Sequence, residues 1–475
     1  MIDVAIIGAG VCGCAIAREL ARLDIHCVLI DKHAEASFGT SKANSGIVHA
    51  SQHSPNHMLK GQLVVKGNAA FDQLSEELGF LFERNGELLI ARSHADIPEL
   101  ERMKRLGEEK GVLGLEILNS EALRKLEPSL SHDIVAALHA PSAGVINPFE
   151  YCFALHENAV NNGIVFMPNT EVLGLKSIKD GLRIDLQRDG KNESIEAHFV
   201  INAAGVHAAK LASFLGEPGF SIHPRKGQEY LLDRAATGGP KRLIFPLPSA
   251  ESKGILIIPT VDNNIILGPT AENIDDFYDL STDRAGQQKI FDSARKTCPN
   301  LKPLQPIAHY AGLRAVSNTD DFIIGTTKHK GFINVAGIQS PGLTAAPEIA
   351  NMVVRILKDE GLSAKPRMSF NPIRKHYPRV FRSSLKEQRE LIKKEPRYAD
   401  IVCRCETISR GEIEDSIDAG ARTLDGIKFR SRAGAGRCQA GFCTMRCLEI
   451  LAQKRNVPIA TLCKNDDGSW ILLDR

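Results

Sequence analysis

The sequence predicts an α/β fold with mixed sheets in its first 360 residues, followed by a separate small helical unit at the C-terminus. Three observations support this prediction. The chain opens with a short apolar strand, a glycine-rich turn and an amphipathic helix. Short runs rich in β-branched residues recur to about residue 267. Six of the 11 cysteines lie beyond residue 400, where the composition changes.

Composition excludes several classes of protein. The chain carries 59 Lys+Arg and 57 Asp+Glu residues, a formal net charge of +2, so no basic excess draws it to nucleic acid. No apolar run approaches the roughly 18–20 residues of a membrane span, so any membrane association is expected to be peripheral at most. A strand-like segment begins directly after Met1, where a signal peptide would stand. We therefore expect a cytoplasmic protein.

Residues 2–31 are typical of a dinucleotide-binding site. A strand runs into Gly8-x-Gly10-x-x-Gly13, a helix follows, and a second strand ends at Asp31. Gly8 permits the tight turn, Gly10 lets the backbone approach a pyrophosphate, and Gly13 lets helix and strand pack closely. The N–H groups of the helix start face the phosphates, and Asp31 accepts hydrogen bonds from ribose hydroxyls. The same predicted site includes Val11, Cys12 and Lys32.

The rest of the chain favours FAD over NAD. No second strand–GxGxxG–helix unit follows in the sequence, and the glycine-rich stretch at 434–436 stands beside Cys438. One nucleotide site with a large second portion fits a tightly held flavin and an external electron acceptor.

Periodicity places the remaining elements. Strands are expected at residues 4–7, 27–30, 254–258 and 265–267. Helices are expected at 99–110, 150–161 and 346–358. Residues 361–399 are basic and punctuated by proline, which predicts a solvated linker over the main domain or, alternatively, a docking surface for an acidic partner.

Several segments resemble the D-amino-acid-oxidase-like superfamily. Residues 38–51 (FGTSKANSGIVHAS) resemble its flavin-contacting loop, and 200–205 (VINAAG), 311–314 (AGLR) and 335–346 (VAGIQSPGLTAA) follow in the order of that family. The branch it most resembles holds FAD-dependent glycerol-3-phosphate and L-2-hydroxyglutarate dehydrogenases. The resemblance implies a Rossmann-like FAD-binding domain (about 1–85, 145–215 and 310–360) interleaved with a mixed-sheet substrate domain (about 86–144 and 216–309). It implies further FAD contacts at Ser41, Asn44, Ser45, Gly46, Val172, Ala204, Gly205, Gly312, Arg314, Gly337, Gly342, Leu343 and Thr344.

Oxidation of a secondary alcohol by flavin requires a base for the hydroxyl proton. His49 is the expected base, because it lies in the flavin loop and because related glycerophosphate enzymes have their proposed base at this motif position. His53 and His57 are nearby alternatives. Arg314 is expected to bind the anionic end of the substrate, since a guanidinium pairs bidentately with phosphate or carboxylate. Further substrate contacts are expected from Ser340, Thr260 and Lys226.

The C-terminal cysteines follow the spacing Cys403-x-Cys405 and Cys438-x4-Cys443, with short helices expected at 408–419 and 423–428 between the pairs. Zinc accepts four thiolates, but its usual spacing is C-x2-4-C on both sides. Residues 400–475 instead resemble the bacterioferritin-associated-ferredoxin type of domain, and this resemblance implies a 2Fe–2S cluster held by these four cysteines. Cys447 and Cys463 are surplus, and Cys447 stays open as an alternate ligand. Small buried thiols are expected at Cys12, Cys14, Cys27, Cys152 and Cys298.

The sequence thus predicts FAD-dependent oxidation of sn-glycerol 3-phosphate, a small anionic alcohol, to dihydroxyacetone phosphate by hydride transfer to flavin. Electrons would leave one at a time through the 2Fe–2S cluster to an electron-accepting partner subunit, within an oligomeric complex. One alternative is the same chemistry on L-2-hydroxyglutarate, another 2-hydroxy acid or an amine. Another is a non-catalytic electron-transfer subunit, against which His49 and Arg314 argue.

Overall fold

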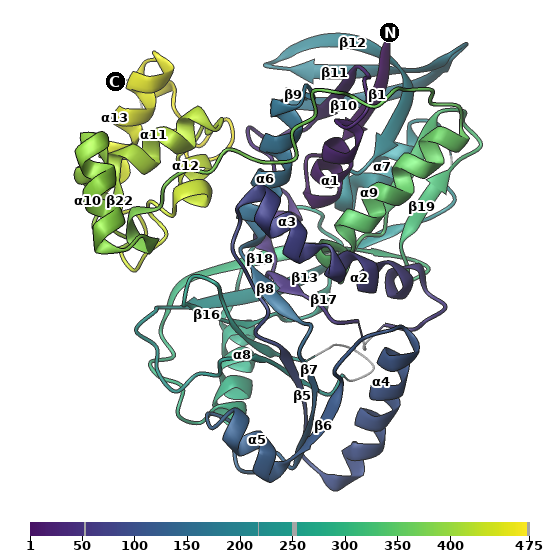
Figure 1. The fold of residues 1–475 in the computed structure, drawn as a ribbon. Coiled ribbons are helices and arrows are strands. Elements are labelled where there is room, and N and C mark those ends of the chain that lie inside the picture. Colours follow the sequence, from purple (N-terminus) through teal and green to yellow (C-terminus); the bar gives the residue numbers. More distant parts are fainter. Residues whose placement is uncertain (52–53, 217, 249–253, 473–475) are drawn as a thin grey trace.

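The computed structural model describes residues 1–51, 54–216, 218–248 and 254–472. Two large sheets form the main part of the molecule, one above the other in Figure 1, and the C-terminal module lies beside the upper one. Within the described residues, no helix is long and apolar enough to cross a membrane.

Parallel strands form the centre of the first sheet, in the order β20-β12-β1-β2-β9. The β10–β11 hairpin extends this sheet antiparallel from β12, and β19 pairs antiparallel with β20. The strands are β1 (Ile2–Ile7), β2 (Cys27–Ile30), β9 (Val165–Met167), β10 (Thr170–Ile178), β11 (Gly181–Arg188), β12 (Lys191–Asn202), β19 (Ile323–Thr326) and β20 (Phe332–Ala336).

Helices cover the faces of this sheet. Helix α1 packs against both α6 and α9, which follow it in the sequence by more than a hundred residues. Asn147 caps α6 by accepting a hydrogen bond from the Glu150 N–H, so the helix begins two residues before the expected position. The helices here are α1 (Val11–Leu20), α2 (Leu59–Ala69), α3 (Phe71–Leu78), α6 (Pro148–Asn161), α7 (Ala208–Ser213) and α9 (Gly342–Asp359).

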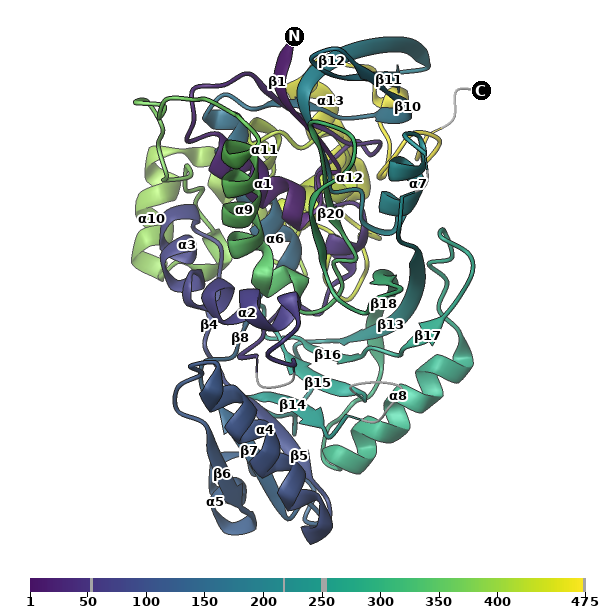
Figure 2. The same ribbon diagram turned by 90° about the vertical axis from the view of Figure 1, so that its right-hand side faces the viewer.

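The second sheet is mixed and has nine strands (Figure 2). Its side chains alternate between two apolar layers: Leu89 packs with helix α4, whereas Leu88 packs with α5 and α8 on the other face. The strands run β17-β13-β16-β15-β14-β5-β7-β6, with β18 beside β13. They are β5 (Glu87–Ala91), β6 (Glu116–Asn119), β7 (Ala136–Ala140), β13 (Ile222–Leu232), β14 (Leu243–Pro246), β15 (Leu256–Pro259), β16 (Ile265–Gly268), β17 (Glu272–Asn273) and β18 (Pro306–Ser317); the helices are α4 (Ile97–Glu109), α5 (Ser120–Leu126) and α8 (Arg284–Thr297).

A small sheet of β3 (Ile47–Val48), β8 (Gly144–Ile146) and β4 (Phe82–Glu83) connects the two parts. The basic segment after α9 is less solvated than the sequence predicts. Arg374, Val380 and Tyr398 are buried in it, because Arg374 pairs with Glu157 at 2.7 Å and the chain follows the surface of the main domain. The segment also contains α10 (Leu385–Lys394).

The C-terminal module is a compact helical unit with its own apolar core. A two-stranded sheet opens it, and three helices follow, the first two close to the predicted ranges. These elements are β21 (Ile401–Cys403), β22 (Ile408–Ser409), α11 (Arg410–Asp418), α12 (Leu424–Ser431) and α13 (Thr444–Arg455). In the main part, the five scattered cysteines are all buried, as expected.

Candidate functional site

A cavity of about 860 Å³ lies between the two large sheets. Its lining includes the turn after β1, the loop after β2, the start of α9 and the paired strands β13 and β18. The predicted residues that line it are Gly8, Gly10, Val11, Cys12, Asp31, Lys32, Ser41, Asn44, Ser45, His49, Val172, Ala204, Gly205, Gly312, Arg314, Ser340, Gly342 and Leu343.

The nucleotide end of the cavity is shaped by backbone that only glycine permits. Gly8 has a φ of +107°, and a Cβ on Gly13 would lie 1.8 Å from the Gly8 carbonyl oxygen. Helix α1 begins at Val11, and its N-cap Gly10 has no side chain to cover the N–H groups of the first turn, which leaves room for an anion there. Asp31 accepts hydrogen bonds from the N–H groups of Ala9 (2.6 Å) and His33 (2.9 Å), which fix its carboxylate beside that turn. These residues fit the ribose and pyrophosphate of a dinucleotide.

The loop predicted to contact the flavin lies against the second sheet. The Ser41 hydroxyl accepts from the Val11 N–H at 2.9 Å and so links this loop to the start of α1. A Cβ on Gly312 would lie 2.6 Å from the Ala43 carbonyl oxygen, so glycine is required for this close approach. Thr344, at the start of α9, accepts from the His49 N–H at 3.0 Å and holds the other end of the loop.

Cross-strand pairs of β13 and β18 form the wall of the cavity at the opposite end. Arg225 lies directly opposite Arg314, and Glu229 lies opposite Tyr310. Side chains of directly paired residues point to the same face, so two guanidinium groups share this wall. Burial lowers the pKa of Arg314 and the charge of Arg225 lowers it further, while Glu229 acts in the opposite direction. Two like charges side by side in a cavity indicate a site for an anion.

Gly227 separates these two pairs on β13. A Cβ at this position would lie 2.5 Å from an Arg314 guanidinium nitrogen, so glycine makes room for the guanidinium. The same guanidinium donates to the Thr270 carbonyl oxygen at 3.2 and 3.3 Å. Arg314 is thus held in place by the sheet while it lines the cavity.

His49 is buried at the cavity wall, with its ring edge-on to Phe245 at 5.9 Å between centroids. Its Nε2 lies 3.2 Å from the Ser340 hydroxyl oxygen. The backbone on both sides of the ring is fixed, because Asn68 donates to the His49 carbonyl oxygen at 3.0 Å and Thr344 accepts from the N–H. The ring is therefore held in one orientation, as a positioned acid or base requires.

Glu229 is a cavity residue that the motif analysis missed. Tyr310 donates to its carboxylate at 2.7 Å, and the Ser45 hydroxyl on the flavin loop donates to the other oxygen. Burial raises the pKa of Glu229, against the effect of these two donors and of Arg314. The available signal was the alternation of the strand: Arg225, Gly227 and Glu229 share the face that lines the cavity.

The same alternation keeps Lys226 out of the cavity, although it was predicted to contact substrate. Its ammonium pairs with Asp279 at 2.7 Å on the other face of the sheet, which raises the pKa of Lys226. Thr260 is also elsewhere, since its hydroxyl closes the β15–β16 turn with the backbone of Asn264. His57 is exposed and does not line the cavity, and His53 lies outside the described residues. Four predicted cofactor residues pack behind the lining instead of forming it: Gly13, Gly46, Gly337 and Thr344.

The four predicted cysteine ligands come together in the C-terminal module. The sulfur of Cys405 lies 3.9 Å from that of Cys403 and 3.6 Å from that of Cys438, and Cys443 contacts Cys403. Burial and the neighbouring Cys403 raise the pKa of Cys405 to about 12. The positive charge of bound iron would favour the thiolate form of these cysteines. Within the described residues, no group of three or more His, Cys, Asp or Glu side chains is arranged around a single metal ion.

Backbone around the thiols also fits a cluster. The Gly434 N–H donates to the Cys403 sulfur at 3.5 Å, the kind of contact that surrounds Fe–S clusters. A Cβ on Gly436 would lie 2.6 Å from the Cys405 sulfur, so only glycine leaves this space. The surplus Cys447 is buried against Cys443, and Cys463 pairs with Trp470 in an isolated bridge.

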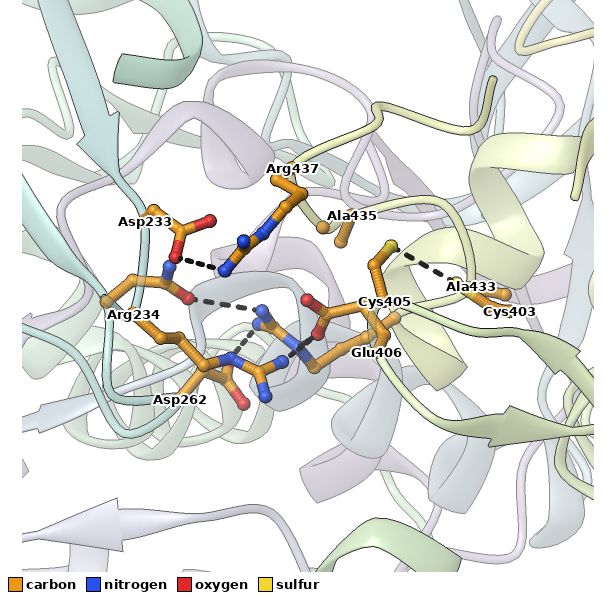
Figure 3. Close-up of polar contacts among 12 residues, drawn as sticks. Asp233, Arg234, Asp262, Cys403, Cys405, Glu406, Ala433, Ala435 and Arg437 are labelled. Carbon is orange, nitrogen blue, oxygen red and sulfur yellow. Dashed lines mark hydrogen bonds and ion pairs between the residues drawn. The ribbon is translucent and has the colours of Figure 1, made fainter. Parts of the chain in front are cut away.

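Charged residues attach the cysteine loops to the second sheet (Figure 3). Arg437 pairs with Asp233 at 3.0 Å, at the end of β13. Glu406, directly after Cys405, binds Arg234, two residues past the end of β13. It also binds Arg432 of its own module at 2.8 Å. The predicted cluster therefore lies beside the sheet that also carries Arg225 and Glu229.

Comparison with known proteins identifies two matching domain families and several similar proteins. Residues 3–356 match the family described as FAD dependent oxidoreductase, and residues 401–453 match the BFD-like [2Fe-2S] binding domain. The chain is 42% identical over 475 residues to a glycerol 3-phosphate dehydrogenase of Caloramator mitchellensis, covering 99% of this chain and 98% of that protein. It is 30% identical to an L-2-hydroxyglutarate dehydrogenase of Escherichia coli, over 57% of this chain and 64% of that protein.

A solved structure confirms the flavoenzyme fold. The FAD-bound, dithionite-reduced L-α-glycerophosphate oxidase of Mycoplasma pneumoniae aligns with a TM-score of 0.75 and 27% identity. The alignment covers 79% of this chain and 99% of that one. Together the two domain matches and this structure confirm the predicted cofactors, FAD and a 2Fe–2S cluster.

Proposed function

Because the chain belongs to the FAD dependent oxidoreductase family, we propose that it oxidises sn-glycerol 3-phosphate to dihydroxyacetone phosphate. The observation that carries this proposal is the Arg225–Arg314 pair in the cavity wall. Two guanidinium groups match the charge of a phosphate group, which is close to a dianion at neutral pH. The likeness to the Caloramator mitchellensis glycerol 3-phosphate dehydrogenase over nearly the whole chain supports the same substrate.

In this proposal each residue has one task. Arg225 and Arg314 hold the phosphate, and the His49 imidazole takes the proton of the C2 hydroxyl. Ser340, 3.2 Å from the His49 Nε2, orients the ring toward that hydroxyl. When bound, the flavin would supply an acceptor for the C2 hydrogen and its electron pair, and the cluster would supply a one-electron route onward from the flavin. Loss of one proton and one hydride from the alcohol gives the ketone.

Glu229 favours an alcohol over a second carboxylate. Its carboxylate already accepts from Ser45 and Tyr310, and it has capacity for further donors. The C1 hydroxyl of glycerol 3-phosphate is a donor, whereas the carboxylates of 2-hydroxyglutarate bring only acceptors and negative charge. This carboxyl group therefore distinguishes the proposed substrate from that of the hydroxy-acid relatives.

Anaerobic mixing of the holoenzyme with each substrate tests the proposal through the flavin absorption band. Glycerol 3-phosphate is expected to bleach the band, and L-2-hydroxyglutarate is not. Bleaching by the hydroxy acid alone would transfer the activity to that substrate class, and bleaching by neither would contradict an enzymatic role. The variant His49→Gln is expected to slow bleaching by about 100-fold or more at saturating substrate, the usual contribution of a positioned base. Glu229→Gln tests the choice of substrate and is expected to raise KM for glycerol 3-phosphate.

We also propose that the electrons pass to an acidic partner protein that binds at the tip of the C-terminal module. Phe442, directly before Cys443, is 87% exposed, and Met445 is 44% exposed. Three exposed arginines lie close to this tip in the sequence: Arg404, Arg437, which pairs with Asp233, and Arg446, which pairs with Asp400. A small apolar patch with exposed arginines near it in the sequence suits a transient interface with an acidic carrier.

This exit is tested with an acidic ferredoxin as the acceptor. Phe442→Ala is expected to slow ferredoxin reduction while leaving the bleaching of the flavin by substrate unchanged. Rising salt is expected to slow ferredoxin reduction by the parent protein. Equal rates for the variant and the parent would place the exit elsewhere.

A further inference from the structure

The C-terminal segment reaches the nucleotide end of the FAD cavity. Asn465 and Asp466 line this cavity, although they lie more than 400 residues from Asp31 in the sequence. Asp466 accepts from the His33 Nδ1 at 2.8 Å and from the Ala34 N–H at 3.1 Å. The module that holds the iron–sulfur cysteines therefore also supplies part of the wall around the flavin nucleotide.

We propose that residues 463–470, here named the C-terminal clamp, close the nucleotide end of the site and keep FAD bound. In this role Asp466 is a positioning residue. It fixes His33, whose backbone N–H in turn donates to the ribose-binding carboxylate of Asp31 at 2.9 Å. Asn465 contributes directly, because it lines the cavity and its carboxamide has N–H donors for the adenosine part of FAD, while the carboxamide oxygen accepts from the Asp466 N–H at 2.7 Å.

The clamp is a built structure and not a loose end of the chain. The Lys464 N–H donates to the Ser469 carbonyl oxygen at 2.8 Å, and the Ser469 hydroxyl accepts from the Asn465 N–H at 3.0 Å. Cys463 pairs with Trp470 across the turn. A closed turn of this kind holds Asn465 and Asp466 in one orientation toward the cavity.

The clamp is tied to the cluster through helix α12. The Asp425 N–H at the start of α12 donates to the Lys464 carbonyl oxygen at 2.8 Å, and the Lys464 ammonium pairs with the Asp425 carboxylate at 3.0 Å. At its other end, α12 leads to Gly434, whose N–H donates to the Cys403 sulfur. The loop after β2 holds the segment directly before this helix, since Glu35 accepts from the Arg422 N–H at 2.6 Å. One short helix thus connects the clamp, the FAD-binding layer and a cluster ligand.

Charge explains why the clamp anchors the protein instead of contacting phosphate. A carboxylate beside an anionic dinucleotide is unfavourable unless it is paired, and the partners of Asp466 are His33 and the Ala34 N–H. The Lys42 ammonium, in the flavin loop, also stabilises the charge of Asp466. Loss of the Asp466 carboxylate would therefore release His33 and the clamp together.

The test uses protein from which FAD has been removed and which keeps its cluster. The FAD dissociation constant is measured by the quenching of flavin fluorescence, and the cluster absorption is recorded in every sample. Asp466→Ala is expected to weaken FAD binding by about ten-fold, the usual effect of losing a charged hydrogen bond. Asn465→Ala is expected to weaken it by a smaller factor. The matched control is Asp467→Ala, an exposed neighbour in the same turn, which is expected to bind FAD like the parent.

A double-mutant cycle then separates positioning from general loosening. If Asp466 acts through His33, the effects of His33→Ala and Asp466→Ala on FAD affinity will be non-additive. Unchanged affinity in Asp466→Ala with a full cluster absorption would overturn the proposal. So would a loss of affinity that appears only in samples that have also lost their cluster, because that result describes unfolding of the module.

Discussion

The C-terminal module meets the rest of the molecule along two contacts that differ in burial. Toward the first sheet, Arg430 pairs with Glu35 at 2.9 Å and with Glu157 at 2.8 Å, and all three side chains are at most 6% exposed. Toward the second sheet, Arg437 pairs with Asp233 while its side chain is 67% exposed. Between these extremes, Arg432 binds Asp262 at 2.5 Å and Glu406 at 2.8 Å.

The difference shows which contact fixes the module and which can adjust. A buried charge that loses its partner is costly, so the Arg430 contact permits one arrangement only. The Arg430 guanidinium also lies over the Phe153 ring, 3.8 Å from its centroid, which adds a cation–π contact. An exposed pair such as Arg437–Asp233 contributes little and can be replaced by water. The Arg430 contact on the nucleotide side is therefore the rigid attachment, and the Arg437–Asp233 pair on the substrate side is the adjustable one.

Arg430→Met is expected to give the largest effect, because it leaves Glu35 and Glu157 buried without their shared cation. A destabilisation of about 3–5 kcal/mol is typical when one partner of a buried pair is removed. Trp470 is the only tryptophan of the chain and lies in the C-terminal clamp, so its fluorescence reports on the attachment during denaturant unfolding. The exposed Arg389→Met on α10 is the control, and a shift no larger than that of the control would contradict the rigid attachment.

Acid is expected to weaken the Arg430 contact less than Arg430→Met does. Protonation of Glu157 removes its charge but leaves a polar carboxyl group in place. Burial alone would raise the pKa of Glu157, but Arg374 and Arg430 more than compensate and hold it below its ordinary 4.5. The stabilisation from Glu157 is therefore complete above pH 4.5 and is lost as the pH falls through the lowered pKa of the folded protein. Trp470 fluorescence between pH 6 and pH 3 measures this loss. The Trp470 fluorescence of the Arg430→Met variant should begin to change at a higher pH than that of the parent, because Glu157 then lacks one of the two cations that lower its pKa. Identical pH profiles would contradict the assignment of this acid effect to Glu157.

Asp262→Asn is expected to give an intermediate effect. The Asp262 side chain is 6% exposed and binds both Arg382 and Arg432, yet Arg432 keeps Glu406 after the substitution. A loss of about 1–3 kcal/mol fits the removal of charge from a buried hydrogen-bonded group. Denaturant unfolding followed by Trp470 fluorescence and by cluster absorption checks this value. A loss equal to that of Arg430→Met would remove the distinction between the two contacts.

Local motifs carried most of what the sequence could predict. The glycine spacing around Gly8 and the cysteine pairs near Cys405 are each read from short segments, because backbone geometry and ligand chemistry limit the residues there. The predicted fold and both cofactors are confirmed by the family matches and the solved relative. Motif position alone predicted substrate contacts for Thr260 and Lys226. Only the structure shows that Thr260 lies in the β15–β16 turn and that strand alternation directs Lys226 to the face away from the cavity.

Contacts between segments far apart in the chain could not be predicted from the sequence. Glu35 and Arg430 are 395 residues apart, and His33 and Asp466 are 433 apart. A buried ion pair leaves no periodic pattern, since each member looks like any surface charge in its own helix or loop. For the same reason residues 361–399 looked like a solvated linker, although Arg374 within them is buried against Glu157.

Arg437→Ala is expected to give the smallest effect on stability, at most about 1 kcal/mol, because the arginine of this pair is 67% exposed. The substitution should nevertheless change the cluster, since Arg437 directly precedes Cys438 and its positive charge favours the reduced, more negative form. The expected result is an unchanged unfolding midpoint together with a lower reduction potential of the cluster. Asp233→Asn is the matched variant: it removes the partner but keeps the arginine, so it should not lower the potential. A large stability loss in Arg437→Ala would show that the substrate-side contact is as rigid as the one around Arg430.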